Sequence, residues 1–383
     1  MFVSRRSFVK VVGASGIGAL AMPLVSARGA EAASVGLVGF ADPPLGSPTG
    51  IRLDSNENPN GPGRVVLDAV HSAFGVANRY PGGPSIALAA AVAKARGVAP
   101  ENVILGCGST EILHVAVRAF TSPTKPLVVA APTFEDPIKV AESIGSGVRS
   151  VPVTGALKLD LAAMAEAARG AGLVYLCNPN NPTATVHGAN AVNDFIHTLG
   201  TTSPETTILV DEAYHEFVED PSYATAIPVA MDNPRVVVAR TFSKIYGLAG
   251  LRIGYALARP ETIKAMGKFK IVNSTNMLAV AGAMAALEGG RHIDRERALN
   301  HDAKAFTHRF FESLGYKVTP SDANFMMVDI RRDSTKFQAE CKARGVLVGR
   351  PFPPLTTHAR ISIGTADEMR RASEIFKRVL VTA

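Results

Sequence analysis

Six short apolar runs, separated by segments with helical periodicity, constrain the fold of this chain most strongly. The runs are VILGCG (103–108), PLVVAAP (126–132), GLVYLC (172–177), TTILVDEAY (206–214), RVVVART (235–241) and RIGYALA (252–258). Continuous runs of valine, isoleucine and leucine are typical of strands that are covered on both faces. Because strands that alternate with helices form βαβ units, we expect an α/β fold with a mainly parallel sheet sandwiched by helices.

Polar or glycine-rich segments follow four of these runs. They are GCGST, NPNNPT, DEAY and TFSK. In open parallel sheets, ligands bind beyond the carboxyl ends of the strands. We therefore expect these four segments to meet at one site.

The rest of the chain predicts a second, smaller domain. A length of 383 residues is enough for one large domain, one smaller domain and a sizeable core. After residue 260, two long helical stretches (261–289 and 294–314) precede short strand candidates and a last helix (367–381). The strand candidates are NFMMVDI (324–330), GVLVG (345–349) and RISIG (360–364). We predict a signal at 1–33, an arm at 34–60 that joins the small domain, a large domain at 61–260 and a small α+β domain at 261–383.

The first 33 residues have the pattern of a targeting signal. SRRSFVK (4–10) precedes an apolar segment that is too short and glycine-rich to span a bilayer comfortably, and Ala30-Glu31-Ala32 offers an A-x-A cleavage site. Arg5 and Arg6, followed by Phe8 and Lys10, resemble the bacterial twin-arginine export signal. The resemblance implies export of the folded protein by the twin-arginine translocase, and a periplasmic or secreted location. The alternatives are a general secretory signal and an uncleaved anchor.

Charge and cysteine content argue against two classes of function. The formal net charge is +7, of which the first 33 residues carry +3, and no dense basic run follows, so nucleic-acid binding is not expected. Cys107, Cys177 and Cys341 are scattered without metal-ligand spacing, and we interpret them as small buried apolar residues. No metal site is expected.

The GCGST segment has the features of a phosphate site. A strand that turns through glycines into a helix directs backbone N–H groups and the helix dipole towards one point. The spacing matches neither a P-loop nor G-x-G-x-x-G, because Glu111 stands at the last position of the latter motif.

Asp211 and Lys244 complete a possible cofactor site. Asp211 ends an apolar strand, and a buried carboxylate there needs a partner, either a metal ion or a cationic ring nitrogen. Nearby, His215 alone does not make a metal cluster. Lys244 could act as a nucleophile if burial or the charge of Arg252 lowered its pKa. Pyridoxal phosphate combines a phosphate, a ring nitrogen and an aldehyde that bonds lysine.

Eight segments resemble those of a known family, in the family's order. They are SNENP (55–59), RYPGG (79–83), GCGSTE (106–111), PTF (132–134), NPNNPT (178–183), DEAYHEF (211–217), TFSKIYGLAGLRIGY (241–255) and RISIGT (360–365). Together they resemble fold-type I pyridoxal-phosphate aminotransferases, in particular the histidinol-phosphate aminotransferase branch. The resemblance covers the chain from about residue 51 to the end and implies an aspartate aminotransferase-like fold.

The resemblance assigns catalytic roles to three residues. Lys244 matches the lysine that forms a Schiff base with the cofactor and then shuttles a proton. Asp211 matches the carboxylate that keeps the pyridine nitrogen protonated. Tyr214, together with Asn181, matches the pair that hydrogen-bonds the phenolic oxygen of the cofactor.

The remaining roles concern binding. Phe134 matches the aromatic residue that stacks on the cofactor ring, and Arg360 matches the arginine that grips the substrate α-carboxylate. Tyr80 matches a tyrosine that reaches the phosphate from the other subunit, which implies an obligate homodimer with shared sites. The residues matched to the phosphate site itself are Ser109, Thr110, Thr241, Ser243 and Arg252.

The sequence departs from the family pattern at the substrate end. Ala184 follows NPNNPT where the family usually has glycine, so a turn with positive φ would be strained there. Arg350 could bind a substrate phosphate, but an additional glycine shifts it along the segment, and Phe352 with its neighbouring prolines could instead shape an apolar pocket. Histidinol phosphate, aromatic amino acids and other L-amino acids all stay open as substrates.

The predicted reaction is transfer of an amino group between an amino acid and a 2-oxo acid. The same scaffold also serves decarboxylases and carbon–sulfur lyases, which break a different bond next to the same lysine, aspartate and phosphate site. A cofactor-binding protein without turnover is a third possibility.

Overall fold

The structure, a computed structural model, describes residues 50–381, which lie in one compact unit that spans Thr49–Ala383. The predicted export signal and most of the N-terminal arm lie outside the described residues. Within residues 50–381, no helix is long and apolar enough to cross a membrane. The division into domains at residue 260 stays a prediction.

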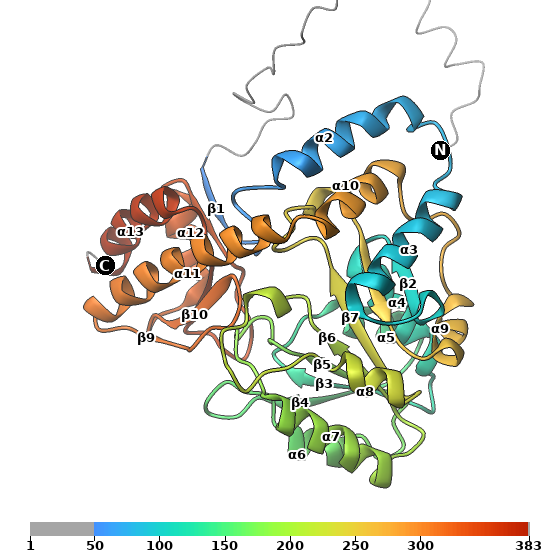
Figure 1. Ribbon diagram of the computed structural model, residues 1–383. Coiled ribbons are helices and arrows are strands. Elements are labelled where there is room, and N and C mark those ends of the chain that lie inside the picture. Colours follow the sequence, from blue (N-terminus) through green and yellow to red (C-terminus); the bar gives the residue numbers. More distant parts are fainter. Residues whose placement is uncertain (1–49, 382–383) are drawn as a thin grey trace, which may run out of the picture. The chain divides into compact units, whose positions relative to one another are not determined.

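A seven-stranded sheet forms the centre of the fold, as expected from the apolar runs (Figure 1). Its strands, in spatial order, are β2 (Val103–Gly106), β8 (Gly254–Leu257), β7 (Val236–Thr241), β6 (Thr207–Asp211), β5 (Leu173–Cys177), β3 (Leu127–Ala131) and β4 (Val148–Pro152). Strand β8 runs antiparallel to both neighbours, and the other adjacent pairs are parallel. The predicted α/β fold class with a mainly parallel sheet is therefore confirmed. The edge strand β4 was not predicted, because most of its side chains are exposed or partly exposed and no apolar run marks it.

Alternate residues of these strands enter two apolar cores, one on each face of the sheet. Val174 and Val210 belong to one core, and Leu173 and Leu209 belong to the other. The first core contains side chains from helices α2 (Arg64–Ser72), α3 (Gly82–Arg96), α6 (Leu161–Ala167), α7 (Ala189–Thr202), α8 (Ile227–Asp232) and α10 (Met277–Leu287). The second contains side chains from α4 (Gly108–Phe120), α5 (Asp136–Ser143) and α9 (Pro260–Gly267). Coverage of both faces explains why the strands read as continuous apolar runs.

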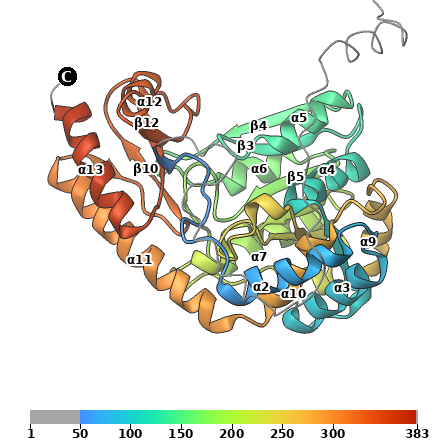
Figure 2. The same cartoon turned by 90° about the horizontal axis from the view of Figure 1, so that it is seen from above.

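The C-terminal elements enclose a third apolar core (Figure 2). Its strands are β9 (Lys317–Val318), β10 (Phe325–Asp329) and β12 (His358–Ser362) in one sheet, and β1 (Ile51–Leu53) with β11 (Val346–Val348) in another. Helices α11 (Gly290–Ser313), α12 (Ser334–Lys342) and α13 (Ala366–Val381) belong to the same region. Strand β1 pairs in parallel with β11, with Ile51 opposite Val346 and Leu53 opposite Val348.

The predicted continuous helix over 261–289 is wrong. It is divided into α9, which ends at Gly267, and α10, which begins at Met277. The side chain of Asn276 accepts a hydrogen bond from the N–H of Ala279 and so caps the start of α10. Helical periodicity on both sides of the break concealed this cap.

Candidate active site

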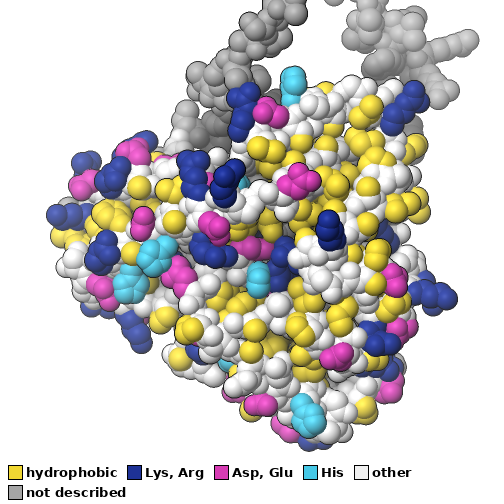
Figure 3. Space-filling model, viewed as in Figure 1, with side chains coloured by type: hydrophobic (Ala, Val, Ile, Leu, Met, Phe, Trp, Pro, Cys, Tyr) yellow, Lys and Arg dark blue, Asp and Glu magenta, His cyan; other side chains and the backbone are white. Residues whose placement is uncertain are grey.

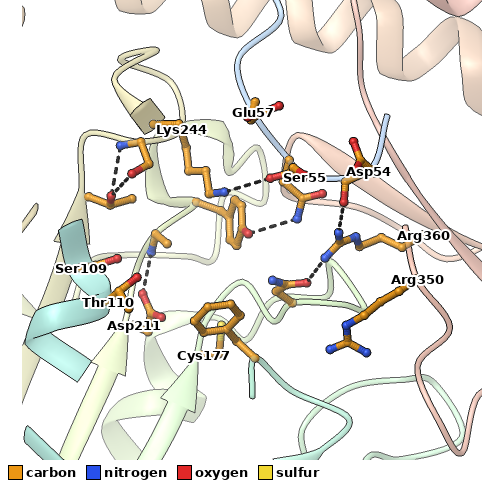
Figure 4. A pocket seen from close by; sticks show the side chains of 18 of the residues that line it. Asp54, Ser55, Glu57, Ser109, Thr110, Cys177, Asp211, Lys244, Arg350 and Arg360 are labelled. Carbon is orange, nitrogen blue, oxygen red and sulfur yellow. Dashed lines mark hydrogen bonds between the residues drawn. The ribbon is translucent and has the colours of Figure 1, made fainter. Parts of the chain in front are cut away.

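A cavity of about 630 Å³ lies beyond the carboxyl ends of the parallel strands. Four segments after β2, β5, β6 and β7 line it, as expected, together with residues 54–57 and residues from the C-terminal region. All the predicted site residues except Tyr80 line this cavity. The tertiary structure thus brings together residues that are up to 251 positions apart, from Ser109 to Arg360. Figure 4 shows Ser109, Thr110 and Asp211 on the left of the view and Arg350 and Arg360 on the right.

One end of the cavity is built to bind an anion. Helix α4 begins there with Gly108, so the backbone N–H groups of its first turn lack helical partners. Arg252 reaches the same place, where Nη2 donates to Oγ1 of Thr110 and Nη1 donates to Oγ of Ser243, each at 3.3 Å. Thr241 completes the cluster by donating from Oγ1 to Oγ of Ser243 at 2.9 Å.

Two glycines allow this close approach. Gly108 has φ of +72°, and a Cβ there would lie 2.3 Å from Nη2 of Arg252. A Cβ on Gly254 would lie 2.3 Å from the backbone nitrogen of Ser109. Any side chain at either position would therefore fill the anion cradle.

Asp211 lies at the end of β6 and is 3% exposed. Oδ2 accepts a hydrogen bond of 2.7 Å from the hydroxyl of Tyr175, and Oδ1 accepts one of 3.2 Å from the N–H of Ala213. Burial raises the pKa of Asp211 to about 6, although the Tyr175 hydrogen bond acts in the opposite direction. A cation next to this carboxylate would lower that pKa and favour the charged form.

Lys244 lies on the loop that follows β7 and extends into the cavity. Its Nζ donates to the backbone oxygen of Ser55 at 3.4 Å and lies 5.5 Å from the ring centroid of Tyr214. Burial, and then the positive charge of Arg360, lower the pKa of Lys244 to about 8. Burial is thus the main cause of the lowered pKa of Lys244. Arg252, the cationic neighbour expected from the sequence, contributes less than Arg360.

Tyr214 and Asn181 stand beside Lys244 and Arg360, respectively. The hydroxyl of Tyr214 accepts a hydrogen bond of 3.2 Å from Nδ2 of Asn56. Arg360 donates from Nη1 to Oδ1 of Asn181 at 2.8 Å, and from Nη2 to the backbone oxygen of Asp54. Burial lowers the pKa of Arg360 to about 10, and its Nε has no hydrogen-bond partner.

Phe134 lines the cavity from the segment between β3 and α5, and Arg350 and Phe352 line it from the segment after β11. The guanidinium of Arg350 stacks on Phe352, at 4.3 Å from the ring centroid, and forms an ion pair of 2.8 Å with Glu135. Arg350 therefore reaches the cavity despite the additional Gly349. Its charge, however, is already paired with that of Glu135.

Tyr80 and His215, which both belong to the sequence motifs, do not reach this cavity. Tyr80 is 83% exposed and lies on the surface, before α3. The ring of His215 packs against Tyr223, with Nδ1 at 3.0 Å from the hydroxyl. Burial lowers the pKa of His215 to about 2. Within residues 50–381, no three histidine, cysteine or carboxylate side chains are grouped to hold a metal ion.

The expected strain at Ala184 is present, because its φ is +62°. Its N–H donates to the backbone oxygen of Asn180 at 2.7 Å, and its oxygen accepts from the N–H of Asp322 at 3.0 Å. These bonds fix the turn, while Asn181 still lines the cavity.

Sequence reasoning missed Tyr175 and Asn56 as site residues. Tyr175 lies within a run that was interpreted as a wholly apolar strand. Its buried hydroxyl, which needs a hydrogen-bond partner, was the one signal in the sequence that could have indicated its role. Asn56 belongs to the SNENP motif but received no role. Its Nδ2 contacts Tyr214, and its Oδ1 accepts from Oγ of Ser362 at 2.7 Å.

Comparison with known proteins identifies the family. The family model for aminotransferase class I and II matches residues 48–376. The chain belongs to this family. The aminotransferase class that was predicted from the eight motifs is thereby confirmed.

Individual class I and II aminotransferases are similar over most of the chain. The histidinol-phosphate aminotransferase of Symbiobacterium thermophilum is 39% identical over 333 residues, which are 86% of this chain and 90% of that protein. That of Moorella thermoacetica is 39% identical over 340 residues, which are 88% of this chain and 86% of that protein. The crystal structure of histidinol-phosphate aminotransferase from Sinorhizobium meliloti in complex with pyridoxal-5′-phosphate superposes with a TM-score of 0.81 at 29% identity, and covers 87% of this chain and 91% of that one. The family and this complex support the predicted cofactor.

Proposed function

We propose that this aminotransferase moves an amino group between an L-amino acid and a 2-oxo acid, with pyridoxal 5′-phosphate in the 630 Å³ cavity. The observation that carries the proposal is the convergence of an anion cradle, a buried carboxylate and a lysine with lowered pKa on one cavity. Each of these three features matches one chemical group of the cofactor. The alternatives on this scaffold are decarboxylation and carbon–sulfur cleavage.

The residues present fit the cofactor. The first turn of α4, with Ser109 and Thr110, would hold the phosphate together with Arg252. Asp211 would pair with the ring nitrogen, and Phe134 would lie against one face of the ring. Asn181 and Tyr214 would bind the phenolic oxygen.

When bound, pyridoxal phosphate supplies an electron sink for the carbanion that forms when the substrate loses its α-proton. Lys244 is the base that accepts this proton at Nζ and later returns it to another carbon. A pKa of about 8 leaves a substantial fraction of Nζ neutral near neutral pH, which an ordinary lysine would not provide. Tyr214, whose ring lies 5.5 Å from Nζ, limits the positions that the amine can occupy.

Arg360 would bind the substrate α-carboxylate. Arg360 as a whole residue is 8% exposed, and its two hydrogen-bond acceptors, Asn181 and the backbone of Asp54, are both uncharged. A carboxylate would supply the missing negative charge and a partner for the unpaired Nε. This contact would fix the substrate so that its α-proton faces Lys244.

A single-turnover donor screen tests the reaction. L-amino acids and histidinol phosphate are mixed one by one with the purified enzyme without any 2-oxo acid, and the cofactor is extracted and identified. Conversion of the cofactor into its amino form supports transamination. Release of CO₂ or sulfide without the amino form would instead assign decarboxylase or lyase activity.

We also propose that two copies of the chain share their active sites. Tyr80 is 83% exposed and lies outside the cavity. Several other large apolar side chains between residues 65 and 86 are also exposed, and Figure 3 shows apolar side chains at the surface on the side of the molecule that carries α2 and α10. These neighbours are Val65, Leu67, Phe74, Val76 and Ile86, on α2, α3 and the turn between them. An apolar surface of this kind is typical of an association site. Sedimentation analysis should give a dimer, and Tyr80→Phe should weaken cofactor binding, whereas a fully active monomer would rule the proposal out.

We propose, finally, that the twin-arginine motif directs export to the periplasm or outside the cell. Its residues lie outside those that the structure describes, so the proposal depends on the sequence alone. Replacing Arg5 and Arg6 together by lysine should retain the enzyme in the cytoplasm. Unchanged export would contradict the proposal and indicate that the segment is a general secretory signal.

A further inference from the structure

Arg350 and Arg360, the two arginines at the substrate end of the cavity, differ in their partners. Arg350 forms an ion pair from Nη2 to Oε1 of Glu135 at 2.8 Å. Arg360 has no ion-pair partner within 4.0 Å among residues 50–381 and donates only to neutral oxygen atoms. The nearest acidic influence on it is Asp54, whose charge raises the pKa of Arg360 but whose carboxylate pairs with Arg52 at 4.0 Å. One of the two positive charges is therefore already neutralised within the protein.

Arg350 contacts Glu135, the backbone of its own loop and an aromatic ring. Besides the bond from Nη2 to Glu135, Nη1 donates to the backbone oxygen of Pro351 at 2.9 Å, and one face of the guanidinium stacks on Phe352. Both terminal nitrogens and one face of this side chain thus have partners. A substrate anion would therefore meet an Arg350 whose positive charge Glu135 already balances.

Glu135 does not itself line the cavity, but it lies directly behind two residues that do, Phe134 and its ion-pair partner Arg350. Glu135 directly follows Phe134 in the sequence and is the N-cap residue of α5. Its second contact is with Nζ of Lys139, from Oε2 at 3.8 Å. A short connection between the wall residue Phe134 and a helix restricts how far Glu135 can move away.

Counting charges indicates which substrates match the site. The α-carboxylate of an amino acid carries one negative charge, which Arg360 alone can neutralise. A phosphomonoester carries about −1.5 to −2 at neutral pH. It would need both arginines and would lie close to the charge of Glu135. A second carboxylate on a substrate meets the same difficulty.

We propose that Glu135 sets the substrate class by neutralising Arg350. The favoured substrates carry a single carboxylate and an uncharged side chain, which lies among Phe134, Val348 and Phe352. Phosphomonoesters and dicarboxylic amino acids are disfavoured. This inference rests on the proposed aminotransferase function, and it selects aromatic and other neutral amino acids from the substrates left open above.

The size of the effect follows from the exposure of the pair. The side chains of Arg350 and Glu135 are 47% and 40% exposed, so water screens their attraction. Ion pairs with such exposure are weak, and their loss changes equilibria by about fivefold or less. Repulsion between Glu135 and a second substrate charge adds to this effect. We expect about tenfold discrimination in total, which should decrease as salt is added.

The test measures binding of unreactive acids as well as turnover. Wild type, Glu135→Gln, Arg350→Gln and the double variant are titrated with 3-phenylpropionate, which has one carboxylate, and glutarate, which has two. Asp136→Asn is the matched control, because Asp136 is the neighbouring acid on α5 and contacts Lys139 but not Arg350. Phenylalanine, glutamate and histidinol phosphate are then compared in single turnovers.

Glu135→Gln should strengthen glutarate binding relative to 3-phenylpropionate about tenfold. It should shift single-turnover rates by a similar factor towards glutamate and histidinol phosphate. Both shifts should disappear when Arg350→Gln is added, and Asp136→Asn should show neither. An unchanged glutarate to 3-phenylpropionate ratio in Glu135→Gln overturns the inference, even if the enzyme transaminates every donor. Failure of every donor to react, with the binding ratio shifted as expected, instead overturns the aminotransferase proposal and leaves the role of Glu135 intact.

Discussion

The hydroxyl of Tyr175 donates a hydrogen bond of 2.7 Å to Oδ2 of Asp211, across two neighbouring strands. Cys177 of β5 lies opposite Asp211 of β6. Tyr175 is two residues before Cys177, so its side chain lies on the same face of the sheet as that of Cys177. Both side chains are almost fully buried. The bond fixes the orientation of the carboxylate that would pair with the cofactor ring nitrogen.

Tyr175→Phe should therefore weaken cofactor binding without changing the anion cradle. The substitution removes a hydrogen bond to a charged group, which is worth about 1.5–3 kcal/mol. We expect the dissociation constant of pyridoxal phosphate to rise at least about tenfold, measured by titrating the apoenzyme. The pKa of Asp211, followed by carbon-13 NMR of the apoenzyme, should rise above its present value of about 6.

Tyr255→Phe is the matched control for this variant. Tyr255 is also a buried strand tyrosine, but its hydroxyl accepts from Nε of Arg96 at 2.9 Å and does not line the cavity. It should lower stability without changing the cofactor dissociation constant. Equal effects of the two variants on cofactor binding would contradict a specific role for Tyr175.

Asp211→Asn should stabilise the apoenzyme at neutral pH while it impairs the cofactor site. The pKa of Asp211 is raised from 3.8 to about 6, so the folded apoenzyme binds this proton more tightly than the unfolded chain. The resulting penalty is fully present above pH 6 and is relieved as the pH falls through 6 towards 4. Urea unfolding should show a gain of roughly 2 kcal/mol at pH 7.5 that shrinks by pH 5. A gain that stayed constant with pH would show that the charge of Asp211 is not its source.

Arg252→Gln should act on the phosphate of the cofactor alone. Arg252 contributes charge-assisted hydrogen bonds next to Thr110 and Ser243, and each such bond is worth about 1.5–3 kcal/mol. We expect pyridoxal phosphate to bind about 30-fold more weakly. Pyridoxal, which lacks the phosphate, serves as the control ligand and should bind wild type and variant alike. A parallel loss of affinity for both ligands would indicate general disruption of the site.

Lys244→Ala should abolish covalent attachment of the cofactor and lower turnover at least about a thousandfold, because both the bond and the base are lost. Borohydride reduction followed by peptide mass spectrometry measures the attachment. Lys270→Ala is the control, since Nζ of Lys270 contacts Ser274 and lies outside the cavity. Attachment that persisted in Lys244→Ala would assign the reactive amine to another residue.

The sequence predicted the central sheet well because burial on both faces leaves a simple signal. The six apolar runs each contain a strand, and the four polar segments after them line the same cavity. Strand β4 and the break between α9 and α10 escaped prediction for opposite reasons. The exposed edge strand lacks an apolar run, and residues 268–276, which separate α9 from α10, were interpreted as a continuation of the helix.

The sequence by itself determined the chemistry of this protein. Strand ends in a parallel sheet meet at one edge, so Ser109, Asp211 and Lys244 had to converge once the strands were recognised. Only the tertiary structure decided what surrounds these groups. The bond from Tyr175 to Asp211 and the pairing of Glu135 with Arg350 join residues 36 and 215 positions apart. Such contacts depend on register and side-chain direction, which local patterns do not specify. Packing therefore sets the pKa of the reactive groups and the choice of substrate, whereas the reactive groups themselves can be recognised from local sequence.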